Sequence, residues 1–145
     1  MKNWIYKDKE ILDINQFPSG SYGFIYRIDV DETSKFYIGK KNLYSNLNVK
    51  LGKKALASLT DKRLSKKKKV TKESDWKTYF GSEAVLKEDI KKYGYNNIQR
   101  TILHISDNKA SLTYQEVRHQ ILLGCLESDT CYNGQVLGKF WKKVA

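Results

Sequence analysis

The chain has little proline and few soft metal ligands, and this excludes several classes of small protein. Its 145 residues include one proline, the two cysteines Cys125 and Cys131, and the two histidines His104 and His119. Two cysteines cannot form the disulfide framework of a small secreted domain, and with two histidines they are a poor set for structural zinc. We interpret Cys125 as a small buried side chain on a helix.

Long apolar runs are also missing. No stretch approaches the ~18 apolar residues of a membrane span, and the N-terminus lacks the apolar core of a secretory signal peptide. Hydrophobic residues make up 40% of the chain and charged residues 30%. This composition supports one modest core under a highly charged surface. The sequence therefore predicts a cytoplasmic protein that is not secreted and has no membrane partner.

Acidic residues are outnumbered, and the imbalance is concentrated in one segment. The 27 basic and 16 acidic residues give a net charge of +11. Between Lys50 and Lys72 the chain has ten basic residues and a single acidic one, Asp61. Ten minus one gives this segment a net charge of +9. We expect a loop, or a short helix followed by a loop, that contacts phosphates in a salt-dependent way. The alternative is a solvated linker without a partner. The basic residues are Lys50, Lys53, Lys54, Lys62, Arg63, Lys66, Lys67, Lys68, Lys69 and Lys72.

Hydrophobic periodicity predicts an α/β domain. Aromatic and β-branched residues favour strands over 22–28, 35–39 and 98–105, the first two forming a hairpin. Apolar stripes at helical spacing predict one helix between a Ser82 cap and Gly94, and another over 112–126. The order of elements predicts a single compact domain with a small three-stranded, mostly antiparallel sheet flanked by helices.

The same analysis predicts the domain organisation. The expected segments are an N-terminal lead-in at 1–21, the domain itself at 22–134 with a basic insert at 48–75, and a C-terminal tail at 135–145.

Two tyrosines in the hairpin are predicted to be neighbours. A turn centred on Asp31–Glu32 gives opposed residues a constant index sum of 63, so Tyr26 would oppose Tyr37. Side chains alternate between faces along a strand, so both would lie on one face. Geometry alone leaves simple packing as the alternative to a function.

The residues around this pair resemble a known family. Gly23-Phe24-Ile25-Tyr26, with Tyr37-Ile38-Gly39 eleven residues later, is similar to the paired signature of the GIY-YIG nuclease superfamily. Four further features resemble phage stand-alone, homing-type members. They are Trp76–Ser82, the strand beginning at Ile98, Glu116 on the last helix, and Tyr132-Asn133-Gly134.

The resemblance implies that the chain hydrolyses DNA with one divalent cation, Mg²⁺ or Mn²⁺, and with no small-molecule cofactor. It implies that Glu116 binds the metal, a role that suits a hard cation with water and phosphate as its other ligands. Tyr26 would deprotonate or orient the attacking water, and Tyr37 would hold phosphate or water. A base role for tyrosine requires a lowered pKa. Asn133 would be structural, fixing the helix end and the site by hydrogen bonds.

Each of these residues has another interpretation. Thr113-x-x-Glu116 is also a capping box, and Asn133 before Gly134 is also a turn signal. Trp76 could contact DNA as a stacking or wedge residue, or anchor the core. Arg100 and Arg27 could touch DNA or cover the sheet.

One departure concerns the cation that stabilises phosphate charge. The family usually has an arginine about ten residues after the second tyrosine, where this chain has Leu47. We name Arg63 and Lys50 as the candidates for that catalytic cation. A lysine would supply charge without a bidentate fork. Strand parity also places Lys41 on the Tyr37 face. The residues expected to contact DNA are Lys41, Lys53, Lys54, Lys62, Lys66, Lys67, Lys68, Lys69 and Trp76.

The resemblance favours a phage homing-type or DNA-degrading endonuclease that acts in the cytoplasm of the host cell. One alternative is a nucleic-acid-binding module that has kept the fold without catalysis. Another is an interaction protein whose basic surface binds an acidic protein. The target site, the type of cut and the oligomeric state have no signal in the sequence.

Overall fold

The computed structural model describes residues 2–50 and 67–142, with the backbone alone at 47–50 and 67–69. The chain divides into two units, one made of Met1–Leu43 with Asp75–Ala145 and the other of Tyr44–Ser74. Five of the basic residues predicted above lie outside the described residues. They are Lys53, Lys54, Lys62, Arg63 and Lys66.

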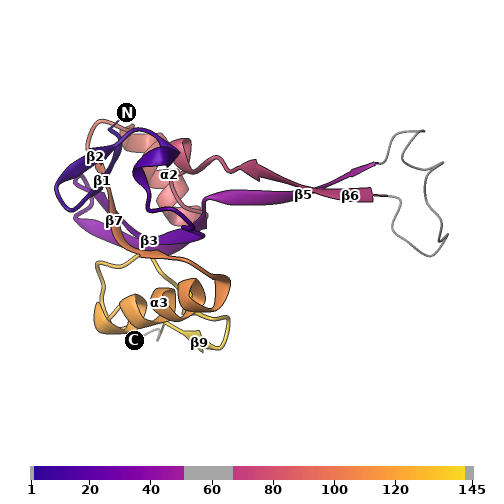
Figure 1. Cartoon of the computed structure of the whole chain (residues 1–145). Helices are drawn as coiled ribbons and strands as arrows, with labels where there is room; N and C mark the ends of the chain where they lie inside the picture. Colours follow the sequence, from indigo (N-terminus) through magenta and orange to yellow (C-terminus); the bar gives the residue numbers. More distant parts are fainter. Residues whose placement is uncertain (1, 51–66, 143–145) are drawn as a thin grey trace, which may run out of the picture. The chain divides into compact units, whose positions relative to one another are not determined.

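A five-stranded mixed sheet forms the first unit, so the expectation of three strands was wrong (Figure 1). Strand order is β2-β1-β7-β3-β4, and only the β1–β7 pair is parallel. The extra strands come from the expected lead-in, and at three residues each they are too short to show a period of two. The strands are β1 (Trp4–Tyr6), β2 (Lys9–Ile11), β3 (Gly23–Val30), β4 (Lys35–Asn42) and β7 (Ile98–Ser106).

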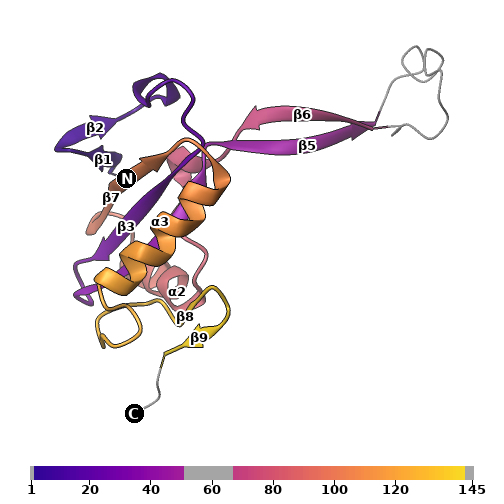
Figure 2. The same ribbon diagram turned by 60° about the horizontal axis from the view of Figure 1, so that its bottom comes forward.

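Two helices, α2 (Ala84–Tyr93) and α3 (Lys109–Leu122), lie on opposite faces of this sheet (Figure 2). Along β3, Phe24, Tyr26 and Ile28 pack in the cluster that contains Leu86 of α2, whereas Ile25 packs with Leu112 of α3. Both faces of β3 are therefore buried, which accounts for its nearly continuous apolar sequence. Neither helix is long and apolar enough to span a membrane.

The N-cap residues of both helices differ from those that the sequence indicated. For α2 the cap is Glu83, whose Oε2 accepts a hydrogen bond from Leu86 N at 2.7 Å, while Gly94 ends the helix as predicted, with φ 82°. The cap of α3 is Asn108, whose Oδ1 accepts from Ser111 N at 2.8 Å. The helix consequently starts and ends earlier than the predicted 112–126. The remaining elements are η1 (Ile14–Gln16), η2 (Trp76–Thr78), β8 (Gln135–Val136) and β9 (Phe140–Trp141).

The β3–β4 hairpin confirms the predicted face and corrects the register. Val30 pairs with Lys35 across a four-residue turn, so Tyr26 pairs with Gly39 and Tyr37 with Ile28. The index sum is 65 where 63 was expected. A shift by two preserves side-chain parity, so Tyr26 and Tyr37 still share a face.

Trp76 belongs to the core of this face. Its side chain is fully buried, and the ring of Phe17 meets it edge-on with the centroids 5.2 Å apart. The indole Nε1 of Trp4 donates to the backbone carbonyl of Trp76 at 2.7 Å. The proposed DNA contact of Trp76 was therefore wrong, because a buried ring cannot stack on a base, and the core-anchor interpretation holds.

The second unit contains an antiparallel pair, β5 (Tyr44–Lys50) with β6 (Lys67–Glu73). Strands therefore occupy the described ends of the basic segment, where a loop or short helix was expected. Thr71 and Val70 are β-branched and lie opposite Asn46 and Leu47, which suits a strand. Lys67, Lys68 and Lys69 belong to β6, and the backbone of Lys50 pairs with that of Lys67.

Arg100 is a buried cation that fixes the segment entering α2. It is 1% exposed, its Nη1 donates to the carbonyls of Lys77 (3.0 Å) and Tyr79 (2.8 Å), and its Nη2 donates to that of Lys2 (2.9 Å). Its guanidinium also lies 4.2 Å from the centroid of the Phe80 ring. Burial lowers the pKa of Arg100 to about 10. Of the two roles considered for Arg100, the structure supports the structural one.

Replacing Arg100 by lysine should cost roughly 3 kcal/mol of unfolding free energy, because an ammonium cannot reach three carbonyls and leaves buried acceptors unsatisfied. Urea unfolding followed by circular dichroism measures this loss. Arg27→Lys is the matched control, since Arg27 is partly exposed and pairs with Asp29, and it should cost less than about 1 kcal/mol. Equal losses in the two variants would contradict the role assigned to Arg100.

Candidate active site

Tyr26 and Tyr37 form the centre of the α2-side face. The Tyr26 ring is buried, and the centroids of the two rings are 6.0 Å apart at an interplanar angle of 41°. They are diagonal neighbours across the hairpin, because the residue opposite Tyr26 is Gly39. The sequence prediction that the pair shares a face is confirmed, whereas direct opposition is not.

Gly39 is required by the position of the Tyr26 ring. A Cβ at Gly39 would overlap the Tyr26 hydroxyl oxygen and lie 2.6 Å from Tyr26 Cζ and 2.9 Å from Tyr37 Cε1. The phenol thus lies directly over the glycine backbone. This is a close-approach glycine, and its motif position has a steric cause.

The segment from Trp76 to Ser82 supplies further hydroxyls to this face. Tyr79 hydrogen-bonds the Tyr26 side chain and meets its ring edge-on at 5.9 Å. Ser82 hydrogen-bonds Tyr37. Sequence reasoning noticed the segment but assigned no role to Tyr79, and it interpreted Ser82 only as a helix cap. The available signal was the match of the whole segment to phage members.

The tyrosines hold their protons tightly. Burial, followed by the neighbouring tyrosine and glutamate charges, raises the pKa of Tyr26 well above its usual value. Burial also raises the pKa of Tyr37 to about 12, against an opposing hydrogen bond from Ser82. A tyrosine acting as a base needs a shift in the other direction. In the protein alone both groups are neutral hydroxyls at physiological pH.

The outer edge of β4 brings two other predicted residues to the site. Asn133 is 4% exposed, its Oδ1 accepts from Ile38 N at 2.9 Å, and its Nδ2 donates to Ile38 O at 2.8 Å. The Nε2 of Gln120 on α3 donates to the same carbonyl at 3.2 Å. Asn133 thus takes the place of a neighbouring strand for one residue of β4, rather than fixing a helix end.

Glu116 on α3 reaches the next outward-facing peptide of β4. Its carboxylate takes a hydrogen bond from the Lys40 backbone, and its charge acts on both Tyr26 and Tyr37. Burial raises the pKa of Glu116, while the Lys40 charge opposes this shift. Because α3 begins after Asn108, Glu116 lies beyond the first turn, and the capping-box interpretation was wrong.

Two lysines of β4, Lys40 and Lys41, lie beside the described site. Lys41 shares the Tyr37 face, as parity predicted, with its Nζ 4.0 Å from the centroid of the Tyr79 ring and 2.5 Å from Asp75 Oδ1. Lys40 lies on the α3 side, where its Nζ donates to Thr113 Oγ1 at 3.2 Å. Sequence reasoning missed Lys40, although it directly follows Gly39. Arg63 falls outside the described residues, and Lys50 is described only in its backbone.

The donor set fits a hard cation held by one protein carboxylate. Among residues 2–50 and 67–142, no three His, Cys, Asp or Glu side chains gather as a metal cluster. The charge of Glu116 acts on both tyrosine hydroxyls, whereas that of Glu83 acts on Tyr37 alone, so Glu116 is the carboxylate common to the pair. Mg²⁺ is commonly bound by one or two carboxylates, with water and substrate phosphate completing its shell.

Alanine at Gly39 should destabilise the fold by about 1–3 kcal/mol, because the added methyl displaces two packed phenol rings. Gly134→Ala is the control, since a Cβ there meets nothing within 4 Å, and its effect should stay within about 0.5 kcal/mol. Chemical unfolding of both variants measures the difference. A neutral Gly39→Ala would show that the rings can move aside at no cost.

The comparisons with known proteins agree with this geometry. A family model described as "Putative endonuclease segE, GIY-YIG domain" matches residues 4–136. No curated protein and no solved structure matches the chain at a significant level. The match covers both motif tyrosines, Gly39, Glu116 and Asn133. The chain belongs to the SegE-type GIY-YIG endonuclease family.

Proposed function

We propose that this endonuclease hydrolyses DNA phosphodiester bonds with a single divalent cation, Mg²⁺ or Mn²⁺, at the face formed by Tyr26, Tyr37 and Glu116. The observation that supports it most is the convergence of one carboxylate, from α3, with two phenols of the hairpin, the buried Tyr26 and the partly buried Tyr37. Glu116 comes from the helix on the other face of the sheet, and the outer edge of β4 is where the two meet.

Glu116 is the residue that would hold the cation. When bound, such an ion polarises the scissile phosphate and lowers the pKa of a coordinated water. The protein adds a partly buried carboxylate, in surroundings where electrostatic attraction is stronger than in water. The peptide N–H of Lys40 orients that carboxylate, as supporting hydrogen bonds do for metal ligands in general.

The tyrosines act as neutral hydroxyls in this proposal. Tyr26 orients the attacking water, and Tyr37 donates a hydrogen bond to a phosphate oxygen. Their raised pKa values favour these roles over direct proton abstraction. Tyr79 fixes the Tyr26 hydroxyl by its hydrogen bond.

Lys41 is the described cation best placed to balance phosphate charge on the tyrosine side, and its pairing with Asp75 holds it over Tyr79. A lysine supplies charge without the bidentate fork of arginine. Arg63 and Lys50 stay as alternatives for this role. The lysine-rich insert would bind the DNA backbone without reading sequence, including Lys53, Lys54, Lys62, Lys66, Lys67, Lys68 and Lys69.

A phage homing-type or DNA-degrading role is the biological setting that we propose. The runner-up is a nucleic-acid-binding module that has kept the fold. Leu47 in place of the usual arginine favours that alternative, and a direct test of cleavage separates the two.

Purified protein should nick supercoiled plasmid with Mg²⁺ or Mn²⁺ and not with EDTA, and Glu116→Gln should lower the rate at least 100-fold while DNA binding persists. The Tm of Glu116→Gln should be equal or higher by up to about 2–4 °C. The sign follows from the raised pKa, because the folded state disfavours the ionised carboxylate and an uncharged isostere removes that cost.

Glu88→Gln, an exposed residue of α2, is the control for the charge change and should cleave normally. Binding without cleavage under every metal would overturn the nuclease proposal and leave the binding module. Equal cleavage by Glu116→Gln would remove Glu116 from the site.

The acid limb of the pH–rate profile should lie above the ordinary glutamate value of 4.5, because burial raises the pKa of Glu116. With the metal below saturation the limb reports the free enzyme. Lys40→Met should move the limb to higher pH, since the Lys40 charge lowers that pKa. Lys35→Met, on the same strand, should leave it in place. A limb that stays fixed in Lys40→Met would contradict the assigned electrostatics.

A further inference from the structure

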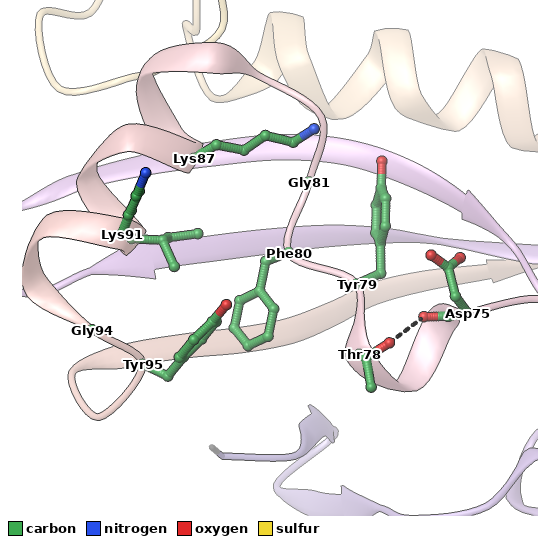
Figure 3. A pocket seen from close by; sticks show the side chains of 10 residues that line it. Asp75, Thr78, Tyr79, Phe80, Gly81, Lys87, Lys91, Gly94 and Tyr95 are labelled. Carbon is green, nitrogen blue, oxygen red and sulfur yellow. Dashed lines mark hydrogen bonds between the residues drawn. The ribbon is translucent and has the colours of Figure 1, made fainter.

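A groove of about 620 Å³ lies beside the tyrosine face, between the segment preceding α2 and α2 itself (Figure 3). Thr78, Tyr79, Phe80 and Gly81 line one side, and Lys87 and Lys91 of α2 line the other. Tyr95, just after the helix, closes one end next to Phe80. The catalytic arrangement described above uses none of the α2 or Tyr95 side chains.

The lining combines cations with an accessible aromatic ring. Lys87 and Lys91 are exposed and one helical turn apart, so both side chains line the same groove. Tyr95 is 46% exposed, and its ring packs on Phe80 with centroids 4.8 Å apart. The acid in the lining, Asp75, is engaged by Lys41, which lowers the pKa of that carboxyl. The groove therefore favours an anion that carries a flat, stackable group.

The groove is continuous with the proposed site of cleavage. Tyr79 belongs to its lining and hydrogen-bonds the Tyr26 hydroxyl. Gly81, also in the lining, lies so close to Tyr37 that a Cβ on it would be 3.5 Å from the Tyr37 ring. In Figure 3 the Lys87 side chain extends toward the segment at Gly81, and the Tyr79 side chain lies beyond that segment. A DNA strand passing the tyrosines thus comes within reach of the groove.

We propose that this groove binds one nucleotide of the DNA strand next to the cleaved phosphodiester, with its base stacked on Tyr95 and its phosphate held by Lys87 and Lys91. Aromatic rings beside lysines are the general means of holding unstacked nucleotides. A base inside an intact duplex cannot reach such a ring, so the nucleotide is unpaired or displaced. This inference rests on the proposed function, because it assumes that DNA crosses the tyrosine face.

Photo-crosslinking tests the position of the base. Glu116→Gln protein is bound to DNA with a short unpaired bubble containing 5-iodouracil, irradiated, digested and mapped by mass spectrometry. Tyr95 should carry the cross-link, and Tyr95→Leu should lose it while the protein stays folded. Tyr93→Leu is the matched control, since Tyr93 is 40% exposed and is not part of the groove lining, and it should retain the Tyr95 cross-link. A cross-link that maps elsewhere would overturn the subsite.

Lysine substitutions test the phosphate contact. Lys87→Gln and Lys91→Gln should each raise the Kd for the bubble DNA severalfold and reduce the slope of log K against log salt by roughly 0.7. Lys92→Gln, next in sequence but outside the lining, should change neither. Three identical responses would overturn the proposal.

Two further outcomes separate the subsite from the nuclease proposal. A Tyr95 cross-link in a protein that never nicks DNA would support the subsite and count against catalysis. Normal nicking without that cross-link would support catalysis and count against the subsite. Loss of the Tyr95 cross-link in the presence of free deoxynucleoside monophosphate at micromolar concentration, while the DNA stays bound with unchanged affinity, would overturn the subsite in favour of a small-molecule site.

Discussion

The site depends on how the outer edge of β4 is satisfied. Strand β4 ends the sheet, so the peptide groups of Phe36, Ile38 and Lys40 point away from β3 and need partners. The segment around Thr130 exchanges backbone hydrogen bonds with Phe36, the Asn133 amide serves both groups of Ile38, and Glu116 takes the Lys40 N–H. The edge is thus closed by one backbone bridge at Phe36 and by the side chains of Asn133 and Glu116, and this closure brings Glu116 to the motif tyrosines.

Parity explains why the tyrosine face could be predicted from sequence and its register could not. Alternation in β3 assigns Tyr26 to one face whatever the turn, because every even shift of register preserves it. The four-residue turn that ends at Ser34, with φ 54°, decides which residue is opposite, and that residue is Gly39. The turn sequence allows more than one such solution. The family resemblance identified Glu116, whose environment is set by contacts distant in sequence.

The contacts that sequence reasoning could not predict share one property, which is that they join distant segments of the chain. Arg100 has its structural role only because the carbonyls of Lys77 and Tyr79 accept hydrogen bonds from it. Tyr79 gains its role only because that anchored segment carries it to Tyr26. Likewise β1 has three residues, pairs locally with β2, and joins the main sheet only through β7. The periodicity and propensity of a segment depend on its own residues alone, so they cannot predict contacts with a distant segment.

Burial acts on every acid of the site in the same direction. It raises the pKa of Tyr26, Tyr37 and Glu116, so the fold keeps the tyrosines protonated and holds the glutamate's charge at a cost in stability. A site built for stability alone would place neutral side chains at these positions. A bound divalent cation would offset the cost at Glu116, because its charge favours the ionised carboxylate. The same burial keeps the hydroxyls of Tyr26 and Tyr37 as donors. At one pH, Glu116 can then be ionised while Tyr26 and Tyr37 stay protonated. A charged carboxylate to bind the metal and neutral hydroxyls to donate to the phosphate are what this site requires.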